Sequence, residues 1–207
     1  MTHQRGRRAS RCPGCGLTPA TCACDLLPRL RFATPVAIVQ HPRERSKPTN
    51  TGRLFARIVE GTRVLDADPP FDPKPLEGGS IDWRLLFPRA GAPLLEPGMR
   101  PAAGRRLGLV VLDGSWRQCA RMSRRLPGIS ELPFVQLPDG PPSFWTVRTQ
   151  HLKQGRSTFE AALRALELLE GPDAAAPLRR AFALVTARFL YLKGTLRSPE
   201  VPAAWGV

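Results

Sequence analysis

The sequence predicts an α/β domain with a largely parallel sheet and helices on both of its faces. Short apolar runs of the kind that buried parallel strands show recur along the chain, most clearly at residues 35–40 and 107–112. Amphipathic stretches of helical length alternate with these runs, as they do in βαβ units. With 207 residues, the chain is long enough to form one domain of ordinary size around its own core.

The first half of the chain contains three expected strands and one expected helix. Residues 35–40, PVAIVQ, are almost continuously apolar, which predicts a strand buried on both faces. A helix is expected at 49–60 because its apolar residues recur with helical spacing and Gly61 follows as a stop signal. Residues 62–65 and 83–87 are shorter strand candidates, separated by a connector rich in proline and glycine.

The stretch LGLVVLDGSWRQ, Leu107–Gln118, is the centre of the prediction. Its apolar run stops at Asp113, and a helix expected at 115–126 opens with the S-x-x-Q pattern of a capping box. In open α/β sheets, ligands bind outside the carboxyl ends of the strands, which is where Asp113 is expected. Its carboxylate either meets a ligand or only complements the helix dipole. Trp116 either lines the site or packs the helix on the sheet.

The last third of the chain continues the alternation. Residues 133–137, PFVQL, form a strand candidate, and a long loop rich in turn residues follows. A helix is expected at 157–170, where Ser157 and Glu160 have the spacing of a second capping box. A final helix is expected at 177–193. The first strand is not followed by GxGxxG, and the chain has no GxxxxGK[ST], so neither a dinucleotide-binding Rossmann site nor a P-loop is supported.

Four of the five cysteines are grouped near the N-terminus, as C-x2-C and then C-x-C with Pro and Gly turns between them. Four thiolates that are this close in sequence can surround one tetrahedral zinc, although two disulfides are the alternative. We predict one structural zinc on Cys12, Cys15, Cys22 and Cys24. Cys119, on the apolar side of the helix at 115–126, is interpreted as an inert core thiol.

The charge balance points to a polyanionic partner. The chain has 31 Lys and Arg against 17 Asp and Glu, a formal net charge of +14, and nucleic acid is the usual partner of such a chain. No apolar window is long enough for a transmembrane helix, and residues 1–11 lack the apolar region of a secretory signal, so we expect no membrane partner and a cytoplasmic location. We divide the chain into a basic arm with the cysteine segment, 1–31, and an α/β domain, 32–207.

One face of the expected helix at 115–126 is strongly basic. Such a stripe is often only a solvated helix face. Like charges at i, i+4 destabilise a helix, however, and here no matching acid is present, which suggests an anionic partner. The four residues of this stripe are Arg117, Arg121, Arg124 and Arg125.

Four sequence blocks together indicate a family. They are the four-cysteine cluster, QHPRE at Gln40–Glu44 with Thr49-Asn50-Thr51, LDGSWRQ at Leu112–Gln118, and RTQ with RSTFEA between Arg148 and Ala161. In this order they resemble the DTW-domain proteins, which include tRNA-uridine aminocarboxypropyltransferases. Ser115 stands where the eponymous motif usually has Thr. The related ribosomal-RNA aminocarboxypropyltransferases tend to carry Ser there, and a hydroxyl is kept in either case.

The resemblance implies a SPOUT-like α/β fold with a C-terminal trefoil knot and S-adenosylmethionine as donor. The group transferred would be 3-amino-3-carboxypropyl, from the donor to N3 of a tRNA uridine, with release of 5′-methylthioadenosine. Because uridine N3–H is only weakly acidic, the reaction needs a base or strong orientation. We expect Asp113 as that base and Trp116 as a wall beside the methyl group of the donor. The oligomeric state, monomer or homodimer, stays open.

The resemblance and the charge pattern together assign binding residues. Those expected at the cofactor are Leu112, Asp113, Ser115, Trp116, Leu137, Pro138, Arg156, Ser157, Thr158, Glu160 and Ala161. For Glu160, the capping box itself is the alternative role. Those expected at RNA phosphates are Arg43, Arg45, Lys47, Arg117, Arg121, Arg124, Arg125, Arg148 and Lys153, and Arg156 shares this role.

Three other functions fit the same features. A SPOUT-type RNA methyltransferase would share fold and cofactor but release S-adenosylhomocysteine. Aminocarboxypropyl transfer to ribosomal RNA would differ only in the acceptor. A non-catalytic, zinc-containing RNA-binding module would bind RNA without saturable binding of S-adenosylmethionine.

Overall fold

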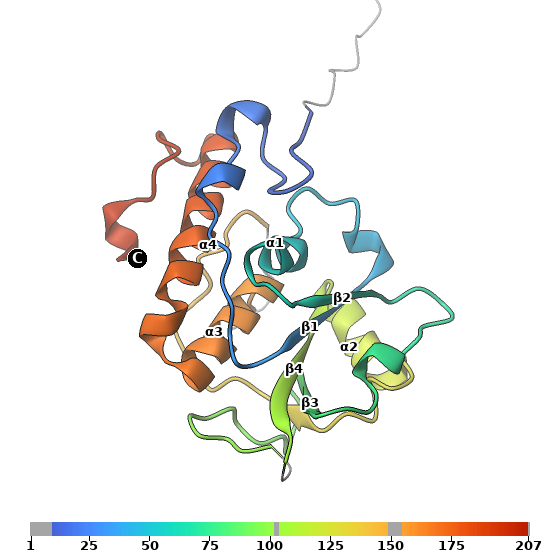
Figure 1. Ribbon diagram of the computed structural model, residues 1–207. Helices are drawn as coiled ribbons and strands as arrows, with labels where there is room; N and C mark the ends of the chain where they lie inside the picture. Colours follow the sequence, from blue (N-terminus) through green and yellow to red (C-terminus); the bar gives the residue numbers. More distant parts are fainter. Residues whose placement is uncertain (1–9, 102–103, 149–154, 207) are drawn as a thin grey trace, which may run out of the picture.

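The computed structural model describes residues 10–101, 104–148 and 155–206. Its centre is a five-stranded sheet, four strands of which are labelled in Figure 1. Every strand pairing in this sheet is parallel, and the strand order is β2-β1-β4-β3-β5. The predicted parallel sheet is therefore confirmed. The strands are β1 (Val36–Gln40), β2 (Arg63–Asp66), β3 (Ile81–Leu86), β4 (Arg106–Asp113) and β5 (Phe134–Val135).

Helices cover both faces of the sheet, as predicted. One face carries α2, and the other carries α1, α3 and α4 (Figure 1). Since α3 and α4 are joined through the single residue Gly171, they form an antiparallel pair on the larger core. The helices are α1 (Thr51–Ile58), α2 (Trp116–Arg125), α3 (Thr158–Glu170) and α4 (Pro172–Leu192).

Alternation along the central strands divides the apolar residues between two cores. Ile38 and Val111 pack with α1, α3 and α4, whereas Val39 and Leu112 pack on the side of α2. Because side chains alternate between the faces of a strand, Asp113 follows Val111 toward the face that α1 and α3 cover. The two-residue period of β4 thus carries its terminal carboxylate into the protein.

The last helix and the last strand differ from the expected bounds. The last helix begins at Pro172 and not at 177, and Pro177 lies inside it. Proline is favoured at the first helical position, and Pro172 takes that place; Pro177, near the helix start, removes only one hydrogen bond. β5 has two residues where five were expected, because Pro133 directly precedes the apolar pair and the Gln136 N–H donates to the carbonyl of Pro93 instead.

The cysteine segment packs on α4 and on the loop before α1 (Figure 1). Arg188 of α4 donates hydrogen bonds to the carbonyls of Thr21 and Cys22. Gly16 has a φ of +76°, and a Cβ there would lie 1.8 Å from the carbonyl oxygen of Pro48. Only glycine permits this approach. No helix within the described ranges is long and apolar enough to cross a membrane.

Candidate active site and metal site

A pocket of about 740 Å³ lies at the carboxyl ends of β3, β4 and β5. Its walls come from the residues that follow these strands and from the start of α3, which is where ligands collect in open α/β sheets. Most of the predicted cofactor-binding residues line it, namely Leu112, Trp116, Leu137, Pro138, Arg156, Ser157, Thr158 and Ala161. The other three, Asp113, Ser115 and Glu160, are described by the structure but lie outside the lining.

Asp113 is buried, with 3% of its surface exposed, and its carboxylate accepts three side-chain hydrogen bonds. Gln40 Nε2 and Asn50 Nδ2 donate to Oδ2 at 3.0 and 2.6 Å. Thr158 Oγ1 donates to Oδ1 at 2.7 Å. One carboxylate therefore connects β1, β4, the N-cap of α1 and the first turn of α3. Thr158 also lines the pocket, so this residue connects the buried carboxylate of Asp113 to the pocket wall.

The position of Asp113 depends on a neighbouring glycine. A Cβ on Gly52 of α1 would lie 2.9 Å from Asp113 Cγ and 3.0 Å from Oδ2. Since real Cβ atoms do not approach so closely, the carboxylate fits only because position 52 has no side chain. Glycine in a helix lowers the stability of that helix, so the role of Gly52 is to leave room for the carboxylate and not to stabilise α1.

Glu160 uses its carboxylate to hold its own helix and a neighbouring loop. The capping box with Ser157 is confirmed. The same carboxylate accepts from the Ser143 hydroxyl at 2.7 Å and from the Phe144 N–H at 3.0 Å. It thereby fixes the loop that leads from the pocket residue Gly140 to the buried Trp145.

Trp116 forms part of an aromatic wall. It is half-buried at the start of α2, and its ring centroid lies 5.8 Å from that of Phe87. Cys119 lines the pocket behind it, and burial raises the pKa of its thiol far above the ordinary value. A thiol that stays protonated is a poor nucleophile, which supports the interpretation of Cys119 as inert.

The four stripe arginines of α2 are all solvent-exposed, and within the described part of the chain none of them makes an ion pair. Burial lowers the pKa of His41 in the loop after β1, the positive charges of Arg43, Lys47 and Arg121 lower it further, and the negative charge of Glu44 opposes them. The exposed face of α2 is strongly cationic.

Several predicted phosphate-binding residues already have acidic partners. The buried carboxylate of Glu44 pairs with Lys47 at 2.5 Å and with Arg148 at 2.8 Å. Arg148 also donates to Thr49 Oγ1 at 2.9 Å, so it joins the loop after β1 to the loop before α3. Arg45 pairs with Asp66 and Asp68. Arg43 is exposed, and Lys153 lies outside the described residues.

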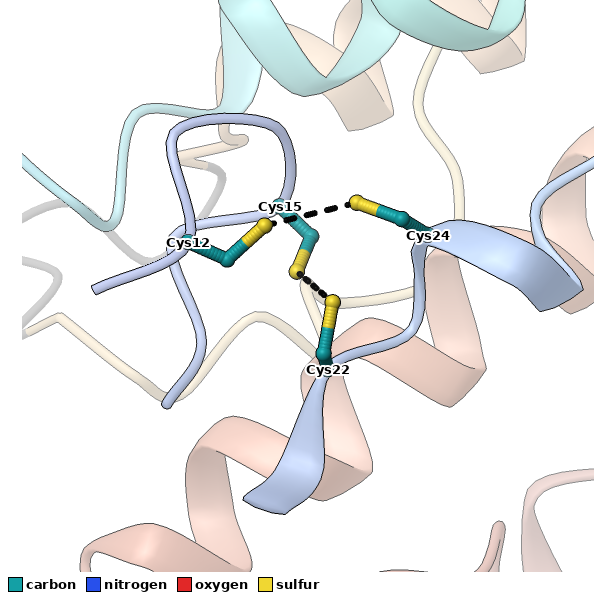
Figure 2. A group of neighbouring side chains, drawn as sticks. All are labelled: Cys12, Cys15, Cys22 and Cys24. Carbon is teal, nitrogen blue, oxygen red and sulfur yellow. Dashed lines mark hydrogen bonds between the residues drawn. The ribbon is translucent and has the colours of Figure 1, made fainter. Parts of the chain in front are cut away.

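The four cysteines meet at one point, as predicted (Figure 2). All their sulfur atoms lie within 4.8 Å of one another, with Cys12 and Cys24 3.5 Å apart and Cys15 and Cys22 3.7 Å apart. Sulfur atoms around a tetrahedral zinc stand roughly 3.8 Å apart, given Zn–S bonds of about 2.3 Å. The donor set therefore fits a structural zinc, and the free cysteines do not form the alternative disulfides.

The family follows from comparison with known sequences. The DTW-domain profile matches residues 9–190, nearly the whole chain. The chain belongs to the DTW-domain family. Among its curated relatives is the tRNA-uridine aminocarboxypropyltransferase 2 of Macaca fascicularis, 27% identical over 175 residues that cover 79% of this chain and 58% of the relative.

Two further relatives of this DTW-domain protein carry the same name. That of Mus musculus is 26% identical over 179 residues, covering 81% of this chain and 59% of the relative. That of Drosophila melanogaster is 28% identical over 176 residues, covering 79% and 68%. The alignments thus span under two thirds of the length of the two mammalian relatives. No solved structure matches the chain.

The family blocks of this DTW-domain protein converge in space. Gln40 and Asn50 come from the second block, Asp113 from the third and Thr158 from the fourth, and all four share one hydrogen-bond cluster. Gln40, Asn50 and Glu44 were not among the predicted site residues. The signal that could have identified Gln40 was the one that identified Asp113, a polar residue at the carboxyl end of a buried strand.

Proposed function

We propose that this DTW-domain protein transfers the 3-amino-3-carboxypropyl group of S-adenosylmethionine to N3 of a uridine in tRNA and releases 5′-methylthioadenosine. The observation that carries the proposal is the pocket at the ends of β3, β4 and β5, whose walls contain residues of the third and fourth family blocks. The names of the curated relatives support the acceptor and the transferred group.

The pocket fits such a donor in size and chemistry. Its volume of about 740 Å³ lies within the range of small-molecule sites. Trp116 and Phe87 offer aromatic surface to a nucleobase, while Arg156 and Asp139 bring opposite charges to the same pocket. A donor whose amino-acid end carries a carboxylate and an ammonium group matches this pair. Arg156 donates to the carbonyl of Pro141 at 2.7 Å, which fixes its position on the pocket wall.

The proposed reaction is a displacement at carbon. Attack of uridine N3 on the donor's Cγ forms the N–C bond and breaks the Cγ–S bond, whose electron pair stays on sulfur. The proton of N3 must go to a base. Transfer of the aminocarboxypropyl group, and not of the methyl group, requires the donor's Cγ to lie in line with N3, and Trp116 would hold the methyl group away from the acceptor.

We propose that Asp113 receives this proton through Thr158. The Thr158 hydroxyl donates its proton to Asp113 Oδ1, so the lone pairs of the hydroxyl oxygen are not used in this bond. Thr158 also lines the pocket. A lone pair on that hydroxyl can accept the N3 proton while its own proton moves to the carboxylate. Thr158 would then contact the acceptor, and Asp113 would act from the buried position in which Gln40 and Asn50 hold it.

The remaining parts of the proposal concern the scaffold. The zinc on the four cysteines would be structural, because four protein ligands leave no open position for water. A SPOUT-like trefoil knot would gather the loops after β4 and β5 around the pocket. The exposed arginines of α2 and the loop after β1 would bind RNA phosphates.

Analysis of tRNA nucleosides from a deletion strain tests the proposal in the cell. We expect a uridine that carries the aminocarboxypropyl group in the parent strain to be absent from the deletion strain. Its return with the wild-type gene, and not with an Asp113→Asn gene, would tie the loss to this site. An unchanged set of tRNA nucleosides would contradict the assignment of tRNA as acceptor.

A further inference from the structure

A second hollow lies between the cysteine segment and the start of α1. It has a volume of about 710 Å³, with residues 11–16 on one wall and residues 45–53 on the other. A third hollow of about 520 Å³ shares Pro13, Gly14, Arg45 and Arg53 with it and extends along α1 to Arg57. Because these lining residues are shared, the two hollows form one continuous depression, here called the cysteine-segment groove.

The cysteine-segment groove is lined mainly by cations. The basic residues in its walls are Arg11, Arg45, Lys47, Arg53 and Arg57, and its acidic lining residue is Asp66. Arg45 and Lys47 have acidic partners. Within the described ranges, the other three arginines have no ion-pair partner. A concave surface in which positive charge predominates attracts a polyanion.

One of these arginines is held by a hydrogen bond, and another lies against the cysteine segment. Arg53 Nη1 donates to the backbone oxygen of Arg45 at 3.0 Å, which restrains its guanidinium at the groove. Arg57 lies against the cysteine segment, since a Cβ on Gly14 would come within 3.0 Å of its Nε and 2.8 Å of Cys24 Sγ. The absence of a side chain at position 14 therefore makes room for a guanidinium directly beside the metal-binding cysteines.

The cysteine segment also contacts the opposite wall of the groove. Gly16 contacts the backbone of Pro48, and Arg188 anchors the segment to α4 through the carbonyls of Thr21 and Cys22. A zinc that closes the four cysteines would therefore fix both the wall at residues 11–16 and its distance from the loop at 45–50. The pocket at the ends of β3, β4 and β5 shares no lining residue with the groove.

The geometry points to the cysteine-segment groove as a binding site for the phosphodiester backbone of the RNA substrate, with Arg53 and Arg57 as phosphate ligands. The zinc segment then has a role in substrate binding in addition to its structural one. This inference rests on the proposed function only in naming the polyanion as substrate RNA. The groove would be a second RNA-binding site besides the arginine stripe of α2, and it lies on the side of α1 that faces the cysteines.

Binding of a tRNA transcript to the zinc-loaded protein, measured over a series of salt concentrations without donor, tests the inference. The affinity falls as salt rises, and Arg53→Ala and Arg57→Ala should each make this dependence less steep, by about one unit in the slope of log affinity against log salt. The double variant should bind the transcript at least about tenfold more weakly. Arg180→Ala, an exposed arginine on α4, is the matched control and should behave as wild type. Zinc content and S-adenosylmethionine affinity should be unchanged in all variants.

A double variant that keeps the wild-type RNA affinity and salt slope would overturn the site. So would normal RNA binding combined with lost binding of poly-glutamate, because that outcome would make the partner an acidic protein. Release of methylthioadenosine by the wild-type protein separates this inference from the proposed function. The wild-type protein could lack that activity while its RNA affinity still depends on Arg53 and Arg57. This result would contradict the proposed function but support the groove as an RNA-binding site.

Discussion

Gln40 and Asp113 stand opposite each other at the ends of β1 and β4, and the Gln40 amide donates a 3.0 Å hydrogen bond to the Asp113 carboxylate. The parallel register brings two strand-terminal polar residues to one face of the sheet. With Asn50 and Thr158 they form a buried cluster, and Thr158 connects this cluster to the pocket wall. A buried cluster of this kind is stable only when each polar group has its partner.

Asp113→Asn tests the proton acceptor. The Asn amide can donate to Thr158 if the hydroxyl reverses, while its oxygen still accepts from Gln40 and Asn50, so the fold should survive. The reversed hydroxyl no longer has a carboxylate to receive its proton. We expect methylthioadenosine release at saturating substrates to fall at least roughly a hundredfold, with tRNA affinity unchanged.

Matched variants of Thr158 refine this test. Thr158→Ser keeps the hydroxyl and should retain most of the rate, whereas Thr158→Val removes it and should behave like Asp113→Asn. If Asp113→Asn binds S-adenosylmethionine poorly but regains normal turnover at high cofactor, Asp113 is a cofactor ligand and the proposed relay is wrong.

Gly52→Ala should destabilise the protein although it improves helix propensity. In an exposed helix, Gly to Ala stabilises by up to about 1 kcal/mol. Here the new methyl group meets the Asp113 carboxylate at 2.9 Å, and overpacking of this kind typically costs about 1–3 kcal/mol. Urea unfolding measures the change. In an Asp113→Ala background the same substitution should cost much less, because the clashing carboxylate is gone. Equal costs in both backgrounds would contradict this close packing.

The cysteine cluster should hold one zinc per chain. Elemental analysis of purified protein should give a ratio near one, and Cys22→Ser should lower both zinc content and thermal stability, because metal binding to such sites contributes to folding. Cys119→Ser is the matched control, since this cysteine is remote from the cluster in sequence and should not affect zinc content. A folded, active wild-type protein without metal would refute the assignment.

The arginine stripe of α2 should contribute to RNA affinity without sequence preference. Arg121→Ala should weaken tRNA binding and reduce the salt slope by about one unit, with little change in S-adenosylmethionine affinity. Equilibrium binding at several salt concentrations measures both quantities. An unchanged slope would mean that this stripe is only a solvated helix face.

The parts of the fold that were predictable are those that a local pattern determines. The strand at 36–40 and the two capping boxes follow from apolar runs and from S-x-x-Q/E spacing, which act over a few residues. The predicted start of α4 was wrong because both Pro172 and Pro177 suit the first turn of a helix, and packing against α3 decides between them. The two-residue β5 depends likewise on its neighbours.

The candidate site was predictable as a set of residues but not as an arrangement. Asp113 and Thr158 were expected at the cofactor, yet only the structure links them by a 2.7 Å hydrogen bond and leaves Asp113 out of the pocket lining. The pair of Glu44 and Arg148 joins residues that are 104 positions apart. No local pattern encodes such a contact, because it depends on how the sheet brings distant loops together.

Product analysis with purified components tests the central proposal most directly. The zinc-loaded protein is incubated with unmodified tRNA and S-adenosylmethionine, and the small-molecule products and tRNA nucleosides are identified by mass spectrometry. We predict methylthioadenosine together with a uridine that carries the aminocarboxypropyl group on N3, and neither product with Asp113→Asn over the same time. S-adenosylhomocysteine with a methylated nucleoside would contradict the proposal in favour of a methyltransferase, and RNA binding without either product would contradict it in favour of a binding module.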